Sequence, residues 1–242
     1  MNLLLLEESD FIAPDRVRIT GRRHKQLYEV IHAEPGKRCK AGLLNGPVGT
    51  AELVSITPEA AELVPSLDRE PPPPLPVTLA VALPRPPTFV KVLHCAATMG
   101  VKRFFFLTTR KAEKSYWSSP AITPPEVAET LKLALEQCGD TVMPQVEFRR
   151  DFRRFVREEL PLLAAESDLF VGHPAAERPL PTRLERPATL LIGPEGGFTD
   201  GEVERFTGCG AVPVTLGRRT LRTEFAVPAL LAKLTAENEE FL

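Results

Sequence analysis

The chain has 242 residues, of which 43% are hydrophobic and 26% are charged, and its formal net charge is −2. This composition supplies enough apolar side chains for a buried core, which excludes a wholly disordered chain. The near-neutral charge excludes a protein held to nucleic acid by a bulk positive field. Any contact with RNA or DNA must therefore come from local basic patches.

The sequence also argues against a membrane protein and against a metal-binding protein. No stretch approaches the roughly 20 uninterrupted apolar residues of a membrane span, and the leucines of residues 3–6 are followed at once by Glu7 and Glu8, unlike a signal peptide. The cysteines lack a CxxC pair or a histidine at metal-ligand spacing. They are Cys39, Cys95, Cys138 and Cys209. We expect a cytoplasmic protein with inert thiols, no membrane segment and no metal.

The first part of the chain is rich in short strand patterns. Residues 17–19 and 39–44 read as strands, and Asn45-Gly46 is a strong hairpin signal before the alternating apolar pattern of residues 48–56. We predict a small β-rich barrel or sheet over residues 1–70.

A proline run, residues 71–76, separates this part from the rest and should form a stiff, extended linker. After it, the apolar run of residues 77–83 is typical of a strand buried on both faces of a parallel sheet. A helix capped by Thr88 and ended by Gly100 follows, and then a strand over residues 101–107.

The same alternation continues along the chain. Thr123 and Glu126 form a capping box for a helix that reaches Cys138. Thr199 and Glu202 form another capping box, which starts a helix after residue 199. Further strands are expected at residues 169–171, 189–192 and 212–216, and a last helix carries Val227, Leu230, Leu231 and Leu234 on one face. Alternating strands and helices predict an α/β domain with a mainly parallel sheet over residues 77–242.

A glycine-rich loop follows one of the predicted strands, where Ile192 leads into Gly193-Pro194-Glu195-Gly196-Gly197. Loops at the carboxyl ends of parallel strands bind ligands, and glycines let a ligand approach the backbone closely. The loop is neither GxGxxG nor GxxxxGK, and its proline lacks an N–H that a phosphate cradle would use. From the glycines alone, a binding loop and a plain tight turn remain equally open.

A second segment, residues 215–226, contains several arginines and a glutamate close to the start of the last helix. These residues allow a purely structural interpretation, in which Thr223 caps the helix, Glu224 stabilises its positive end and the arginines are solvated.

Together the two segments carry a resemblance. LLIGPEGGFTDGEVE at residues 190–204 and LGRRTLRTEFA at residues 216–226 closely resemble the LLIGPEGG and LG-x-R-x-LRTET-A patterns of the RsmE-type methyltransferases of 16S ribosomal RNA, in the SPOUT superfamily. The likeness extends to Met99-Gly100-Val101, to residues 135–138 and to His173-Pro174.

The chain departs from the family pattern at several positions. Phe225 replaces the second Thr of LRTET, and Pro228 stands just inside the last helix. The family's lysine near the start of the first helix of the second domain has no obvious counterpart. Lys91 and Arg85 are the two candidates for its role.

The resemblance implies a two-domain enzyme. A PUA-like RNA-binding domain would occupy residues 1–70, the linker of residues 71–76 would form the joint, and residues 77–242 would form a methyltransferase domain tied in a trefoil knot, a rare exception to unknotted folds. Such enzymes are homodimers that use S-adenosylmethionine to methylate N3 of one uridine in the 16S ribosomal RNA of the small subunit.

The same resemblance assigns residues to the cofactor, and the chemistry of uridine N3, whose proton must leave, indicates residues for the acceptor. The cofactor would be bound by His173, Ile192, Gly193, Pro194, Glu195, Gly196, Leu216, Gly217, Leu221, Arg222 and Thr223. Arg222 would stabilise negative charge on the uridine carbonyl oxygens. Glu224 would take the N3 proton or orient Arg222, with Glu195 as the competing acid.

Basic residues cluster in the first 40 positions and suit the positioning of RNA phosphates. They are Arg16, Arg18, Arg22, Arg23, Lys25, Lys37, Arg38 and Lys40. A solvated surface without a partner is the alternative.

Two other functions remain open. One is a SPOUT enzyme that acts on transfer RNA or on another ribosomal nucleotide, which Phe225 and Pro228 leave possible. The other is an RNA-binding protein that kept the fold but lost catalysis, against which the intact LRTE segment of residues 221–224 argues.

Overall fold

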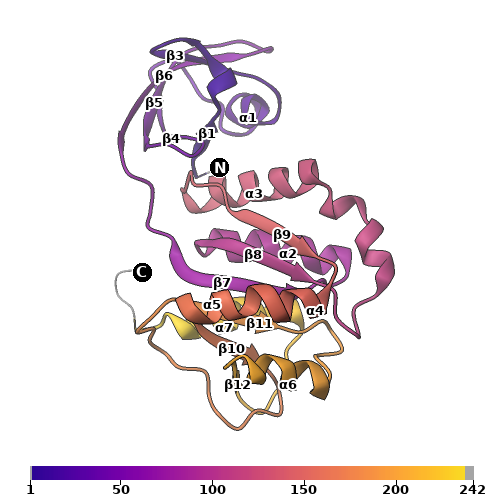
Figure 1. The fold of residues 1–242 in the computed structure, drawn as a ribbon. Coiled ribbons are helices and arrows are strands. Elements are labelled where there is room, and N and C mark those ends of the chain that lie inside the picture. Colours follow the sequence, from indigo (N-terminus) through magenta and orange to yellow (C-terminus); the bar gives the residue numbers. More distant parts are fainter. Residues whose placement is uncertain (1, 238–242) are drawn as a thin grey trace. The chain divides into compact units, whose positions relative to one another are not determined.

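The structure is a computed structural model that describes residues 2–237 (Figure 1). The chain forms two compact units. The first unit comprises Met1–Pro72 and Lys132–Met143, and the second comprises Pro73–Leu131 and Pro144–Leu242. Each unit has its own six-stranded sheet and its own buried hydrophobic cluster.

The first unit is built on a sheet in the order β1-β4-β5-β6-β3-β2. Its strands are β1 (Leu4–Leu6), β2 (Phe11–Ala13), β3 (Arg16–Ile19), β4 (Arg38–Leu43), β5 (Val48–Ile56) and β6 (Ala61–Arg69). Alternation along β5 buries Ala51 and Leu53 and exposes Thr50 and Val54. Helix α1 (Gly21–Lys25) continues into a π-type turn (Gln26–Val30) that places Leu27 in the same core. The β-rich first part predicted from the sequence is therefore present.

The second unit is an α/β domain whose sheet, in the order β12-β10-β11-β7-β8-β9, is parallel throughout. Its strands are β7 (Leu75–Ala82), β8 (Val101–Leu107), β9 (Gln145–Arg149), β10 (Asp168–Gly172), β11 (Ala188–Ile192) and β12 (Val212–Val214). Its helices are α2 (Pro86–Thr98), α4 (Phe152–Arg154), α5 (Leu160–Glu166), α6 (Asp200–Gly208) and α7 (Thr223–Leu234). Helix α3 (Pro124–Cys138) is divided between the two units at Lys132.

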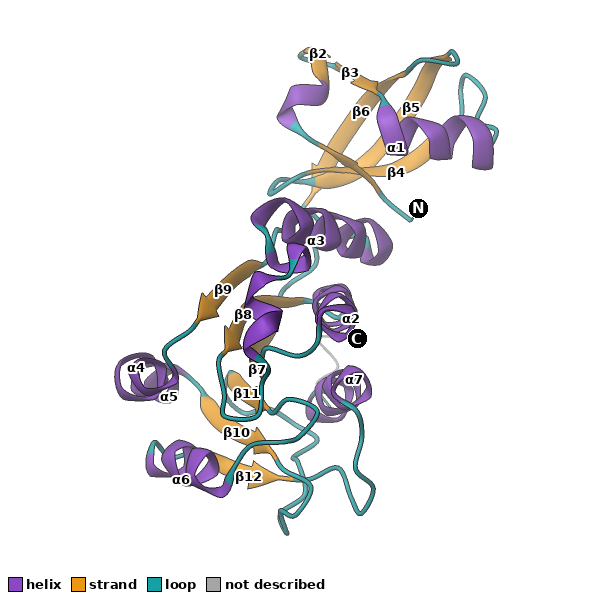
Figure 2. Cartoon of the chain, turned by 90° about the vertical axis from the view of Figure 1, so that its right-hand side faces the viewer, coloured by secondary structure: helices purple, strands orange, loops and turns teal. Residues whose placement is uncertain are grey.

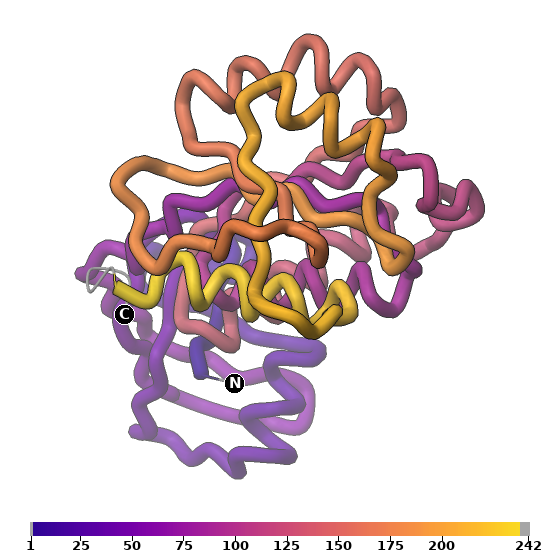
Figure 3. Tube along the Cα trace, turned by 90° about the horizontal axis from the view of Figure 1, so that it is seen from below, coloured from indigo at the N-terminus to yellow at the C-terminus, as the bar shows by residue number. Residues whose placement is uncertain are grey.

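Helices cover both faces of the parallel sheet. Figure 2 shows α4, α5 and α6 on one face and α2 and α7 on the other. This arrangement explains the continuous apolar run of β11, in which every residue is buried. Figure 3 follows the chain, in orange to yellow, from β11 through α6 and β12 to α7.

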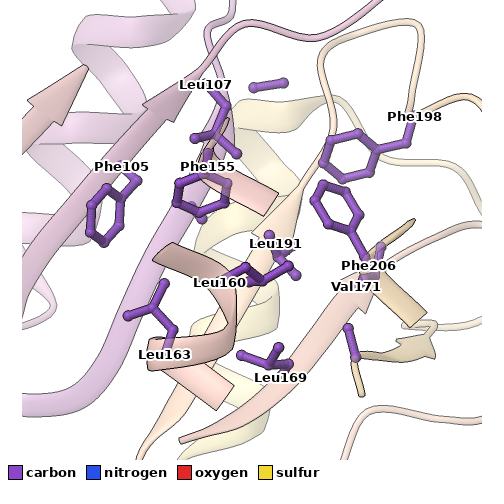
Figure 4. Close-up of a cluster of buried hydrophobic side chains, with 13 residues drawn as sticks. Phe105, Leu107, Phe155, Leu160, Leu163, Leu169, Val171, Leu191, Phe198 and Phe206 are labelled. Atoms are coloured by element: carbon purple, nitrogen blue, oxygen red, sulfur yellow. The ribbon is translucent and has the colours of Figure 1, made fainter. Parts of the chain in front are cut away.

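A cluster of buried side chains lies between the sheet and α4 to α6 (Figure 4). It joins Phe105 of β8 and Leu191 of β11 to Leu163 of α5 and Phe206 of α6. Phe198, which comes from the glycine loop after β11, packs edge to face on Phe206 with the ring centroids 5.0 Å apart. The hydrophobic core therefore holds one end of that loop.

Several details differ from the sequence prediction. Strand β7 begins at Leu75, inside the predicted linker of residues 71–76, and Lys132–Met143 groups with the first unit instead of the second. Helix α2 begins at Pro86 after Arg85, so Thr88 lies inside its first turn and does not cap it. Prolines fit the first positions of a helix because the N–H groups there have no helical partner. The helix therefore starts at Pro86, upstream of the predicted start. Strand β12 ends at Val214, since Thr215 makes an isolated bridge with Pro179 instead of continuing the strand. Pro228 lies inside α7, as its sequence position indicated.

The cysteines are free and half-buried. Burial raises the pKa of the Cys39 and Cys95 thiols, which keeps them protonated and unreactive near neutral pH. Among residues 2–237, no helix combines the length and the apolar character needed to cross a bilayer. In the same range, no three His, Cys, Asp or Glu side chains gather closely enough to hold a metal ion.

Two adjacent leucines of α5 test this description of the core. Leu163 is 3% exposed, so Leu163→Ala should lower the free energy of unfolding by about 2–5 kcal/mol in urea titrations. Leu162 is 67% exposed, and Leu162→Ala should change it by less than about 0.5 kcal/mol. Equal losses in the two variants would contradict the assigned packing of α5.

Candidate functional site

Three loops leave the parallel sheet at one edge. Gly172 at the end of β10 is paired with Ile192 of β11 and with Val214 of β12. Because these strands are parallel and in this register, the residues that follow them emerge together, at the edge where α/β sheets bind ligands. The loops that begin there comprise residues 173–187, 193–199 and 215–222.

The second of these is the glycine loop, which makes a tight turn. The Gly197 N–H donates to the Pro194 carbonyl over 2.8 Å, and Gly197 has a φ of +68°, in the left-handed region that favours glycine. A Cβ on Gly193 would lie 2.9 Å from the backbone nitrogen of Phe198. Both glycines are thus required by the shape of the loop.

Polar contacts hold the loop at its far end. Glu202, in the first turn of α6, is buried and accepts hydrogen bonds from the Thr199 N–H at 2.8 Å and from the Arg110 N–H at 2.7 Å. Thr199 and Glu202 form the capping box that the sequence predicted. From the loop after β8, the Lys111 ammonium donates to the Gly196 carbonyl over 2.8 Å.

The first and third loops are held to each other by backbone hydrogen bonds. The Leu180 N–H donates to the Thr215 carbonyl over 3.1 Å, and the Thr215 N–H donates to the Arg178 carbonyl over 2.9 Å. The Thr215 hydroxyl in turn accepts from the Gly217 N–H. Segments distant in sequence therefore form a continuous wall.

The loops enclose a cavity of about 390 Å³, within the usual range for small-molecule sites. Most of the residues predicted to bind a cofactor line it, whereas Gly217 and Arg222 do not. The predicted residues on the cavity wall are His173, Ile192, Gly193, Pro194, Glu195, Gly196, Leu216, Leu221 and Thr223.

Other lining residues were not predicted. Ala226 and Leu230 reach the cavity from α7, and the apolar stripe of that helix could have indicated them. Lys111, Asp200 and Arg219 add charge to walls that are otherwise largely apolar. Lys111 comes from a loop without a motif, so no local sequence signal marks it. The walls suit a ligand with a flat apolar part and charged groups.

The two predicted catalytic residues have different surroundings in the structure. Arg222 is the exposed N-cap residue of α7, and within residues 2–237 no ion pair joins it to Glu224. The Glu224 side chain is 7% exposed, and its Oε1 lies 4.0 Å from Nη2 of Arg85, at the start of α2. Arg85 also approaches Glu195 on the cavity wall, with Nε 3.8 Å from Oε1.

The basic residues predicted for RNA divide into two groups. Arg22 makes a bidentate contact with Glu136 at 2.8 and 2.9 Å, and Arg23 makes one with Asp10 at 2.6 and 2.8 Å. Arg16 and Arg38 pair with Glu62 and Glu52. Exposed residues without an ion pair in the described part of the chain are Arg18, Lys25, Lys37 and Lys40. The first group is therefore engaged in ion pairs within the first unit, and the second group makes none in the described range.

Comparisons with known proteins agree with this geometry. Residues 71–235 match the family model described as RNA methyltransferase domain. The ribosomal RNA small subunit methyltransferase E of Treponema pallidum is 27% identical over 242 residues, which cover 98% of this chain and 91% of that protein. The Synechocystis protein of the same name is 29% identical, with 93% and 76% covered.

Solved structures share the fold. A ribosomal RNA small subunit methyltransferase E from Neisseria gonorrhoeae, bound to S-adenosylmethionine, superposes with a TM-score of 0.75 at 22% identity. The match covers 96% of this chain and 95% of that one.

The anchoring of the glycine loop can be tested at α6. Glu202→Ala would remove a buried carboxylate that accepts from the Thr199 and Arg110 N–H groups, and should lower the free energy of unfolding by about 1–3 kcal/mol. Glu204, exposed on the same helix, is the matched control, and Glu204→Ala should have little effect. Thermal and urea unfolding measure both; comparable stabilities would show that Glu202 does not hold the loop.

Proposed function

This chain belongs to the RNA methyltransferase family, and we propose that it transfers the methyl group of S-adenosylmethionine to N3 of a uridine in 16S ribosomal RNA of the small subunit. The observation that carries the proposal is the cavity built from the loops after β10, β11 and β12, in a chain of this family. The small-subunit substrate is supported by the relatives that match nearly the whole chain.

The cavity fits S-adenosylmethionine in size and in chemistry. Ile192, Leu216 and Leu221 offer apolar walls for the adenine, and the glycine loop offers backbone groups at close range. Glu195 and Asp200 are acids suited to the positive sulfonium end, whereas Lys111 and Arg219 suit the carboxylate of the amino acid. The bound cofactor supplies a methyl group on a positively charged sulfur, which keeps the electron pair as that methyl leaves.

The chain must then prepare the acceptor nitrogen. In our proposal Glu224, buried beside the cavity, accepts the proton of uridine N3, so that the electron pair of the broken N–H bond forms the new bond to the methyl carbon. No covalent nucleophile is required, because the reaction is an in-line displacement that depends on alignment. Arg222, at the exposed entrance of α7, contacts the incoming RNA.

The two units divide these tasks. The first unit acts as a PUA-like RNA-binding domain, residues 71–74 as the linker, and the second unit as the catalytic domain with a trefoil knot. The sheet of the first unit and the absence of regular structure over residues 71–74 support the division.

The enzyme works as a homodimer in the cytoplasm, where it meets ribosomal subunits. Helices α2 and α7 pack on each other and leave Val90 and Phe225 exposed, at 38% and 60%. Exposed apolar side chains on adjacent helices suit an interface between two copies.

The function is tested with small ribosomal subunits from cells that lack the enzyme. Incubation with the purified protein and labelled S-adenosylmethionine should place label in 16S ribosomal RNA, and nucleoside mapping should identify 3-methyluridine at one position. Label in transfer RNA alone, or in another nucleoside, would refute the assignment.

The cofactor site is tested at Gly193. Gly193→Ala places a Cβ against the backbone of the loop and should weaken S-adenosylmethionine binding at least about tenfold in calorimetry. A Cβ on Gly201, in α6, would meet nothing within 4 Å, so Gly201→Ala should bind normally. A folded Gly193→Ala variant with unchanged affinity would exclude the glycine loop from the site.

RNA binding by the first unit is tested by replacing the four exposed, unpaired basic residues with alanine. The substituted residues are Arg18, Lys25, Lys37 and Lys40. Affinity for 16S ribosomal RNA should fall and its salt dependence should become shallower, because fewer phosphates are neutralised. The control removes the same number of exposed charges from the second unit, at Lys91, Arg153, Arg183 and Arg205. If the control loses as much affinity, the first unit has no special role.

A further inference from the structure

A second set of groups lies beside the cavity. Arg85, the residue before α2, has its guanidinium between Glu195 of the glycine loop and Glu224 of α7, at 3.8 and 4.0 Å. Both separations are too long for hydrogen bonds. Arg85 does donate through Nε to the Thr88 hydroxyl over 3.1 Å, and its backbone N–H lies 3.4 Å from Glu195. The guanidinium is therefore held through its Nε atom, while its Nη1 and Nη2 atoms remain able to donate to another group.

The Arg85 guanidinium lies near the Glu224 carboxylate, one oxygen of which accepts no hydrogen bond from the described residues. The Nη1 and Nη2 groups of Arg85 form no hydrogen bond with any of residues 2–237. Glu224 Oε2 is buried, yet it too accepts no hydrogen bond from the described residues. A buried carboxylate oxygen without a donor is costly, and its retention calls for a specific reason.

Helix stability does not supply that reason. Arg85 stands at the positive end of α2, where the helix dipole disfavours a cation, and the first turn of α2 contains no acidic residue. Glu224 does sit at the favourable end of α7, but this would not require its carboxylate to be buried away from water. Both groups are better explained by a ligand.

We infer that Arg85 and Glu224 together bind the imide edge of the target uracil. This inference rests on the proposed function. The N3–H of uracil is a donor flanked by two carbonyl acceptors, which complements a carboxylate oxygen beside guanidinium N–H groups. Glu224 Oε2 accepts from N3–H while Arg85 donates to a neighbouring carbonyl oxygen.

The same pair selects against cytosine. N3 of cytosine carries a lone pair, which would face the carboxylate oxygen of Glu224 with no hydrogen between them. A site built to hydrogen-bond one edge rejects an analogue that leaves its buried groups unpaired. Uridine specificity thus arises from two side chains on different helices.

Arg85 also acts on the chemistry. When N3 loses its proton to Glu224, the negative charge spreads onto the carbonyl oxygen that Arg85 contacts, and the guanidinium stabilises it. Glu195 and Thr88 position Arg85 for this contact. Lys91, by contrast, is exposed on α2 without an ion pair in the described range.

Arg85→Ala tests the inference, with Lys91→Ala as the matched control on the same helix. In single-turnover methylation of small ribosomal subunits near pH 7, Arg85→Ala should lose about a hundredfold in rate, as for removal of one charge-stabilising donor. Lys91→Ala should keep the wild-type rate. Affinity for S-adenosylmethionine and the melting temperature should stay unchanged in both variants.

The pH profile separates charge stabilisation from a structural role. Without Arg85 the N3 proton is held more tightly, so the loss should shrink as the pH rises from about 6 to 9. The charged and titratable groups that face Arg85 are Glu195, Glu224 and Tyr116. Desolvation raises the pKa of Tyr116, as do Glu113 and Glu195, so Tyr116 stays neutral over this range. Arg85→Lys, which keeps a charge, should recover part of the rate.

Three results would overturn the inference: a wild-type rate in Arg85→Ala, an equal loss in Lys91→Ala, or a loss independent of pH that accompanies weaker cofactor binding. These outcomes differ from failure of the proposed function, in which the wild-type protein itself would transfer no label to ribosomal RNA.

Discussion

The parallel register of β10, β11 and β12 is the constraint on which the site depends. Gly172, Ile192 and Val214 are level with one another, so three loops distant in sequence begin side by side. A shift of one residue in β11 would turn its side chains to the opposite face and move the glycine loop away from its neighbours. The position of the cavity is thus set by the pairing of the strands, and the loops only line it.

The glycine loop turns tightly at its centre and is firmly attached at both ends. Ile192 and Phe198 belong to buried parts of the structure, and Glu202 binds the backbone just beyond. Between them the backbone turns at positions that only glycine fills without strain or collision. A loop fixed in this way needs little reorganisation when a ligand arrives, which preserves binding energy for alignment.

The sequence was informative wherever the signal is local. Apolar runs placed β7, β8 and β11, and the Thr199–Glu202 capping box placed α6, because these patterns depend on neighbours a few residues apart. The glycine loop and the LRTE segment were ambiguous taken singly, and the family resemblance of the two together assigned them to a site. The β-rich first part followed from alternation and a hairpin signal.

Partners brought together by the fold were not predictable. A run of basic residues looks alike whether or not acids lie opposite, so the ion pairs of Arg22 with Glu136 and of Arg23 with Asp10 could not be predicted from it. Likewise Glu224 was paired with its neighbour Arg222, whereas Arg85, far upstream, is the cation that faces it. Such pairs depend on how strands and helices are ordered in space, which short patterns do not encode.

Pro228 makes the first turn of α7 less stable than the rest of the helix. Proline has no N–H to donate to the carbonyl of the residue four positions earlier, which is Glu224. The first turn of α7 is therefore secured by fewer hydrogen bonds than a complete helix would provide, and it opens locally at a lower free-energy cost than the turns that follow. Segments of low local stability are those that move as ligands enter and leave. The glycine loop is thus more firmly held than the first turn of α7, which carries Glu224, and in the proposed function that turn is the part that moves as the RNA base enters and leaves.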